Sequence, residues 1–191
     1  MDEDIVNIVS GLPRSGTSLM MKMLEEGGLV PLTDNIREAD VDNPKGYYEF
    51  ERVKKLPGDI DWLPDAKGKV VKVLAELIKH LPDGFNYRIV FMMRDLDEII
   101  SSQRKMMVRR GEDPDKVPDD EMRNLLRTYL KNLKVFVNSH PNMKVCYISY
   151  NELMTDPDLS IDEISEFFNG KLDLKRMRRA IDEKLYRNRN I

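Results

Sequence analysis

The sequence predicts an α/β fold with a mainly parallel central sheet and helices on both of its faces. Short apolar runs, typical of buried strands, alternate with amphipathic helical segments along the whole chain. The first apolar run also passes through a glycine-bracketed turn directly into a helical segment, which indicates a βα unit. At 191 residues the chain is expected to form a single domain over residues 1–191, long enough to bury a core.

The apolar patterns place the strands and helices along the chain. Strands are predicted at residues 5–10, 69–74, 87–93 and 143–149. Helices are predicted at residues 19–24, 75–80, 96–107, 119–137, 161–168 and 174–185. The helix at 119–137 should bury an apolar stripe made of Leu125, Leu126, Tyr129, Leu130, Leu133 and Val137.

The composition is typical of a soluble globular protein. Charged residues make up 34% and apolar residues 41% of the chain, and the net charge of −3 argues against a nucleic-acid partner. The single cysteine, Cys146, excludes an internal disulfide, is expected to be a buried thiol and fits a reducing compartment. The acidic N-terminus lacks an apolar signal core, and no stretch approaches the ~20 apolar residues of a membrane span. We therefore expect a cytoplasmic protein without a membrane span.

Residues 11–18, Gly-Leu-Pro-Arg-Ser-Gly-Thr-Ser, form the turn between the first strand and the first helix. Strand, glycine loop and helix together suit a phosphate, because glycines let the backbone approach it and the helix N-terminus adds partial positive charge. A nucleoside-triphosphatase loop would carry a lysine directly after Gly16, but Thr17 stands there, and the cation of the loop is Arg14. We predict a phosphate loop of the nucleotide-binding type, in which Thr17 and Ser18 cap the helix or donate to phosphate. An ordinary capped turn is the alternative.

A second candidate anion site follows the strand at residues 87–93. Arg94 ends this strand and belongs at the same sheet edge as the glycine loop, where ligands bind in such folds. Ser101 and Ser102 follow seven and eight residues later, and one of these serines could join Arg94 at one anion. A surface arginine paired with Asp95 or Asp97 is the alternative. Two anion sites at one edge predict a nucleotide with phosphates on both sides of its ribose.

Three segments resemble motifs of the sulfotransferase family. Residues 11–18 resemble its 5′-phosphosulfate loop, and their Pro-Arg-Ser-Gly-Thr form is closest to the tyrosylprotein and related bacterial-type enzymes. Arg94 with Ser102 resembles the family's 3′-phosphate motif. Residues 150–157, Tyr-Asn-Glu-Leu-Met-Thr-Asp-Pro, are similar to its Tyr-Glu-Asp-Leu…Asp-Pro segment. The matches stand in the family's order and span roughly a quarter of the chain.

The resemblance implies sulfonate transfer from 3′-phosphoadenosine 5′-phosphosulfate (PAPS) to a hydroxyl or amine, with adenosine 3′,5′-bisphosphate (PAP) as product. It implies that Arg14 holds the 5′-phosphate and the bridging oxygen of the leaving group. Lys72 resembles the lysine of the family's Lys-Thr-His segment, which implies a place near the transferring sulfonate. The other implied contacts are Ser15, Gly16, Thr17 and Ser18 to the 5′-phosphate, Arg94 and Ser102 to the 3′-phosphate, and Tyr150 to the base.

The chain departs from the cytosolic enzymes of that family at several points. Two aliphatic residues follow Lys72, so the histidine base is absent. Arg14 stands where those enzymes carry a lysine, and no tryptophan follows the loop to stack on the adenine. Their glycine-rich C-terminal nucleotide segment is also missing, and its candidate substitutes are Arg187 and Arg189.

A carboxylate is expected to replace the missing histidine as general base for an alcohol acceptor. The first candidate is Glu49, in the stretch at residues 43–49, and the second is Glu38. An exposed loop carboxylate without a catalytic role is the alternative for Glu49. Catalysis would otherwise depend on positioning and on the positive charges of Arg14 and Lys72.

The long, weakly periodic stretch at residues 29–63 should form the acceptor side of the site. The short chain leaves little room for a large acceptor domain, which favours a small-molecule acceptor; a monomer and a homodimer both stay open. No metal is expected, since His80 and His140 are isolated. Two other functions stay open: a small-molecule kinase, against which the missing lysine after Gly16 counts, and a nucleotide-binding module without catalytic activity.

Overall fold

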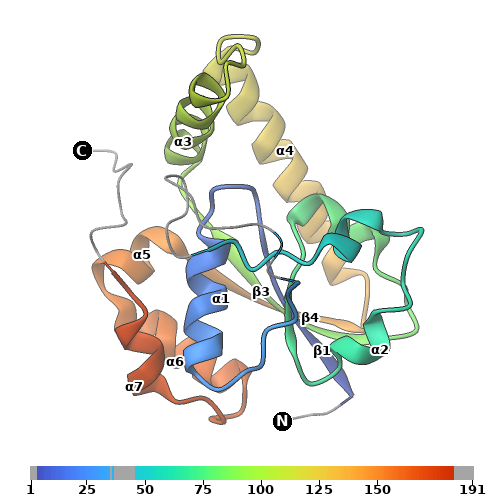
Figure 1. Ribbon diagram of the computed structural model, residues 1–191. Helices are drawn as coiled ribbons and strands as arrows, with labels where there is room; N and C mark the ends of the chain where they lie inside the picture. Colours follow the sequence, from blue (N-terminus) through green and yellow to red (C-terminus); the bar gives the residue numbers. More distant parts are fainter. Residues whose placement is uncertain (1–3, 35, 37–45, 183–191) are drawn as a thin grey trace.

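The computed structural model of the protein describes residues 4–34, 36 and 46–182 (Figure 1). Its centre is a four-stranded sheet in the order β2-β1-β3-β4. The strands are β1 (Ile5–Gly11), β2 (Val70–Lys72), β3 (Asn86–Met93) and β4 (Met143–Ser149). Each pairs in parallel with its neighbour, so the predicted parallel sheet is confirmed.

The chain leaves β1 toward one neighbour and then crosses to the other, since β1 lies between β2 and β3. The register pairs Val9 with Lys72 and Gly11 with Met92, which brings the carboxyl ends of three strands together. Ligands of parallel α/β sheets bind beyond these ends, where the strand order reverses. The glycine loop begins at this point of the sheet, above the strands in Figure 1.

Side chains alternate between two apolar layers along the strands. On β1, Val6 and Ile8 enter one layer and Val9 enters the other. The layer of Val9 is completed by residues of α1 (Thr17–Glu26), α5 (Tyr150–Thr155), α6 (Pro157–Phe167) and α7 (Leu174–Arg179). The opposite layer is completed by residues of α2 (Leu63–Ala66), α4 (Asp119–Asn138) and the 3₁₀ helices η1 (Glu51–Lys55) and η2 (Ala75–His80). The prediction of helices on both faces is confirmed.

Helices α3 (Leu96–Arg109) and α4 form a hairpin that rises from the body of the protein (Figure 1). The apolar stripe of α4 is buried only toward its C-terminal end, at Leu133 and Val137. Leu125 is 56% exposed, and the other members of the predicted stripe are partly buried: Leu126, Tyr129 and Leu130. The predicted stripe therefore belongs to the core mainly in its C-terminal half, because the first turns of α4 extend beyond the sheet beside α3.

Several helix limits differ from the predictions, and capping explains two of them. Helix α6 begins at Pro157, earlier than predicted, since proline suits the first helical position. Helix α5 was not predicted; it begins after Ser149, whose side chain accepts the N–H of Glu152. The helix predicted at 174–185 ends at Arg179, and residues 183–191 lie outside the described part of the chain.

Cys146 is half-buried rather than buried, which corrects the sequence prediction. It lies on β4, the outermost strand of the sheet, which has a neighbouring strand on one side only. Burial still raises the pKa of its thiol from 9.0 to about 11, with a smaller contribution from Glu163.

The described part of the stretch at 29–63 is tied to the sheet edge at β2. The N–H of Val70 donates to the carbonyl of Val30 at 3.0 Å, and the N–H of Leu32 donates to the carbonyl of Val70 at 2.8 Å. The carboxylate of Asp34 accepts the N–H of Glu51 at 2.6 Å. This hydrogen bond links residues 29–34 to the described segment at residues 46–63. Among the helices of the described residues, none is long and apolar enough to cross a membrane.

Candidate functional site

The glycine loop is shaped by two glycines that lie close to other atoms. Gly11 has φ 150° and Gly16 has φ 98°. A Cβ added to Gly11 would lie 2.4 Å from the Ser15 Oγ, and one added to Gly16 would lie 2.3 Å from the Cδ2 of Tyr150. The left-handed backbone at Gly16 and this close approach both require a residue without a side chain. Arg14, between them, also has a positive φ of 74°.

Helix α1 starts differently from the expectation at Thr17 and Ser18. Gly16 occupies the N-cap position and offers no capping side chain, while Thr17 and Ser18 are the first helical residues. Ser15 is fully buried, and its Oγ has no hydrogen-bond partner within the residues that the structure describes. An uncapped helix N-terminus beside a buried, unpaired hydroxyl is an arrangement that suits an anion.

The two predicted anion sites lie next to each other. The Nε of Arg14 donates to the Oγ of Ser102 at 2.9 Å, across 88 residues of sequence. The Nη1 of Arg94 donates to the main-chain carbonyl of Arg14 at 2.9 Å. Ser102 is buried, and it lies on the second turn of α3, which begins directly after Arg94 and Asp95. The loop arginine, the strand-end arginine and the helix serine therefore form one cluster at the sheet edge.

Arg94 forms a buried ion pair with a residue that the sequence analysis did not select. Its Nε donates to the Oε2 of Glu98 at 2.9 Å, and the two side chains are only 8% and 3% exposed. The alternative partners are engaged elsewhere: Asp95 caps α3, and Asp97 pairs with Arg123. The spacing of four residues at a helix start is a signal that could have identified Glu98.

Tyr150 and Asn151 connect α5 to this cluster. The ring centroid of Tyr150 lies 4.5 Å from the Arg94 guanidinium carbon, and the same ring lies against Gly16. Tyr150 is 6% exposed, and its buried ring packs against both the Arg94 guanidinium and the glycine loop. The amide of Asn151 donates to the Oε1 of Glu98 at 3.0 Å and accepts the N–H of Asp95 at 3.0 Å.

Lys72 brings a further cation to the glycine loop from β2. Its side chain is buried, and its Nζ donates to the Oγ of Ser18 at 3.1 Å and to the carbonyl of Tyr47 at 2.7 Å. The structure thus joins β2, the start of α1 and the acceptor-side segment through one ammonium group.

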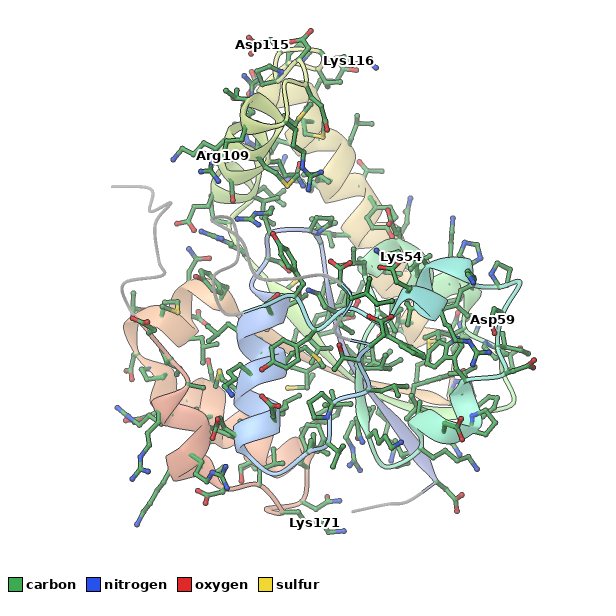
Figure 2. All side chains as sticks on the ribbon, viewed as in Figure 1. Lys54, Asp59, Arg109, Asp115, Lys116 and Lys171 are labelled. Carbon is green, nitrogen blue, oxygen red and sulfur yellow. The ribbon has the colours of Figure 1, made fainter. Side chains whose placement is uncertain are left out.

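Glu49 lies on the acceptor-side segment and pairs with a lysine. Its Oε2 is 2.9 Å from the Nζ of Lys54, which projects from η1 and is labelled in Figure 2. The side chain of Glu49 is 16% exposed, whereas Glu51, the second partner of Lys54, is 41% exposed. Hydrogen bonds to Glu51 and then to Glu49 raise the pKa of Lys54.

The other sequence candidates are not among the side chains that the structure gathers at the glycine loop. Glu38, Arg187 and Arg189 lie outside the described residues. The ring of His140 packs on Phe136 at the end of α4, away from the loop. Within residues 4–34, 36 and 46–182, no group of three metal-ligating side chains is close enough to hold a metal ion.

The fold and the site define a protein of the phosphate-loop α/β class, with cationic side chains gathered at the switch point of a parallel sheet. A model described as the sulfotransferase family matches residues 45–173, which is more than half of the chain. The chain therefore belongs to the sulfotransferase family. The matched range includes Lys72, Arg94, Ser102 and Tyr150 and begins after the glycine loop.

Two solved structures resemble most of the chain. The sulfotransferase domain from the curacin biosynthetic pathway shares 14% identity, with a TM-score of 0.51, over 94% of this chain and 88% of that one. Retinol dehydratase in complex with androsterone and inactive cofactor PAP shares 15% identity, with a TM-score of 0.47, over 94% of this chain and 64% of that one. At 14% identity the first likeness concerns the fold. No curated protein matches the sequence.

Proposed function

We propose that the protein transfers a sulfonate group from PAPS to a hydroxyl or amine of a small-molecule acceptor. The observation that carries this proposal is the contact between Arg14 and Ser102, which joins the glycine loop to the strand-end site. A nucleotide with phosphates on both its 5′ and 3′ sides would meet one cationic group at each end. Membership of the sulfotransferase family is consistent with this chemistry.

The donor would be held mainly by residues of the cluster. The 5′-phosphate would be surrounded by the loop residues Arg14, Ser15, Gly16, Thr17 and Ser18. The N-terminus of α1 and the buried Ser15 hydroxyl would stabilise its negative charge. The 3′-phosphate would be held by two further residues, Arg94 and Ser102. Tyr150 is buried between Gly16 and Arg94. It would either contact the adenine base with the edge of its ring or act indirectly, by holding the Arg94 guanidinium that lies over the ring.

The transfer itself would be an in-line displacement. The acceptor oxygen or nitrogen forms a bond to sulfur, and the bond from sulfur to the bridging oxygen of the 5′-phosphate breaks. The electron pair of that bond stays on the leaving phosphate oxygen, where Arg14 and Lys72 would stabilise the developing charge. The product nucleotide is PAP, and the acceptor proton goes to a base.

Glu49 is the proposed base among the described residues. Its pairing with Lys54 keeps the carboxylate in place at low exposure, two residues after Tyr47, whose carbonyl contacts Lys72. We expect Glu49→Gln to abolish transfer while leaving PAP binding intact. Glu51→Gln is the matched control, because Glu51 also contacts Lys54 but is more exposed. Unchanged turnover in Glu49→Gln would reject Glu49 as the base and leave Glu38 as the candidate.

The first test of the donor is thermal stability with PAP, with ADP and ATP-Mg²⁺ as controls. A ligand at ~100 times its dissociation constant adds roughly 2.7 kcal/mol to the free energy of unfolding. PAP alone should stabilise the protein, and Ser102→Ala should reduce that effect while Ser101→Ala, its neighbour in α3, should not. Stabilisation by ATP-Mg²⁺ alone would instead favour a kinase, and turnover of PAPS with acceptors would separate an enzyme from a non-catalytic module.

A further inference from the structure

Glu98 is a buried carboxylate at the proposed 3′-phosphate site, and the proposed reaction assigns it no role. It is 2% exposed, and its Oε2 lies 2.9 Å from the Nε of Arg94. A carboxylate at this position repels an approaching phosphate, since like charges a few ångströms apart oppose each other strongly in a partly desolvated site. The presence of a buried carboxylate at a proposed phosphate site therefore needs an explanation, because it opposes the binding that the arginines favour.

The hydrogen bonds around Glu98 have a fixed direction. The Oδ1 of Asn151 accepts the backbone N–H of Asp95 at 3.0 Å, so its Nδ2 must be the atom that donates to the Oε1 of Glu98 at 3.0 Å. The other Glu98 oxygen accepts from Arg94. Both oxygens of Glu98 are thus acceptors, which is the pattern of an ionised carboxylate held between α3 and α5.

We propose that Glu98 is a positioning residue with two coupled effects on the nucleotide site. It holds the Nε edge of the Arg94 guanidinium, so that the orientation of the arginine is set before a nucleotide binds. Its charge also offsets that of Arg94, which lowers the affinity for the 3′-phosphate. This inference rests on the proposed function, because it assumes that Arg94 contacts that phosphate.

The expected consequence concerns binding and release rather than the chemical step. PAPS and PAP carry the same 3′-phosphate, so a charge at Glu98 weakens both to a similar degree. Such uniform weakening raises KM and speeds the release of PAP without changing the bond-breaking step. The site would then favour turnover over tight retention of its product.

An exchange of the two side chains separates the charge from the hydrogen bonds. In Glu98→Gln the new amide would present a donor to the donor of Asn151, and in Asn151→Asp two carboxylates would face each other. In the double variant the amide introduced at position 98 accepts from Arg94 and donates to the carboxylate introduced at position 151, which still accepts the N–H of Asp95. The net charge is unchanged, but the negative charge lies one hydrogen bond further from Arg94.

The test compares the affinities of PAP and 5′-AMP, which lacks the 3′-phosphate, for the wild type and for the Glu98→Gln/Asn151→Asp variant by calorimetry. We expect the double variant to melt closer to the wild type than either single variant does. We also expect it to bind PAP about threefold to tenfold more tightly, with its affinity for 5′-AMP unchanged. In turnover, KM for the donor should fall while single-turnover transfer stays the same.

Equal PAP affinity in a folded double variant, or weaker affinity, would overturn the proposal and leave Glu98 as a structural ion pair. If the double variant does not fold, the wild type still provides a test through the NMR signal of the Arg94 Nε–H, assigned with Arg94→Lys. That signal should persist when PAP binds, because the Nε–H stays on Glu98 while the phosphate meets the other edge of the guanidinium; its loss would show that Glu98 does not hold the Nε edge. A wild type that binds PAP no better than 5′-AMP would overturn the proposed function itself, and this inference with it.

Discussion

The two ends of helix α3 use the same kind of interaction in opposite surroundings. At its start, Arg94 and Glu98 form an ion pair whose side chains are 8% and 3% exposed. Toward its far end, Arg104 pairs with Asp115 in the loop to α4, and those side chains are 29% and 78% exposed. Figure 2 shows Asp115 and its neighbour Lys116 at the tip of the hairpin, pointing into solvent.

Helix α3 is held more firmly at its start than at its far end. An exposed ion pair typically contributes about 0–1 kcal/mol, because water and salt screen it. Removal of one partner from a buried pair typically costs about 3–5 kcal/mol, because the other charge stays buried and unpaired. The start of α3 is thus a fixed part of the candidate site, whereas its far end is held by contacts that contribute little.

The largest expected effect is that of Gly16→Ala, which breaks the support beneath the buried pair. The added Cβ would meet the Tyr150 ring at 2.3 Å, and φ at this position is 98°. We expect a loss of roughly 3 kcal/mol or more in the free energy of unfolding, together with loss of PAP binding. Gly28→Ala is the matched control: its φ is 105°, so it shares the backbone strain, but no atom lies within 4 Å of its added Cβ, and it should cost less than Gly16→Ala, about 1–3 kcal/mol.

Arg94→Met against Arg104→Met tests the comparison directly. Arg94→Met leaves Glu98 buried without its ion-pair partner, so we expect a destabilisation of about 3–5 kcal/mol in urea unfolding. Arg104→Met removes exposed pairs with Asp115 and Asp119 and should cost far less than Arg94→Met. Equal losses in the two variants would contradict the distinction between the two ends of α3.

The same contrast between a buried and an exposed position should appear along α4 for uncharged, apolar side chains. Leu133 is 7% exposed and packs in the apolar layer that contains Val6 and Ile8, so Leu133→Ala should cost about 2–4 kcal/mol. Leu125 is 56% exposed on the projecting half, and Leu125→Ala should stay within about 0.5 kcal/mol. A thermal or urea titration of both variants measures this. A comparable loss for Leu125→Ala would mean that the outer half of α4 is packed more tightly than its exposure indicates.

The last prediction concerns Cys146, on the strand that leads to Tyr150 and Asn151, and it needs no substitution. Burial raises the pKa of its thiol from 9.0 to about 11, so the neutral thiol is favoured in the folded protein. Its contribution to stability is therefore fully present below about pH 9 and is lost as the pH rises toward 11. At pH 8, iodoacetamide should alkylate the folded protein at least about tenfold more slowly than the unfolded chain, because less of the folded thiol is ionised. The chain has a single cysteine, so the signal is unambiguous, and equal rates would show that β4 opens readily.

Local chemistry determined much of this protein. The strand positions follow from apolar runs, and the loop at residues 11–18 follows from its glycines and Arg14. The rule that parallel strands end at one edge was sufficient to place Arg94 beside that loop. These features depend on residues near one another in the sequence or on a general property of the fold, so they could be predicted without coordinates.

Tertiary packing alone decided which side chains meet within the site. Three carboxylates lie within four residues of Arg94, and only the turn of α3 and the position of Asn151, 53 residues beyond Glu98, select Glu98 as the buried partner. The same applies to Tyr150, for which the family resemblance implied a place near the base and which the structure buries under Arg94. Periodicity identified the apolar face of α4, but the extent of the sheet beneath it determined which half of that face is buried. Burial and pairing depend on what lies opposite a residue in space, and a pattern along one segment carries no information about its partner.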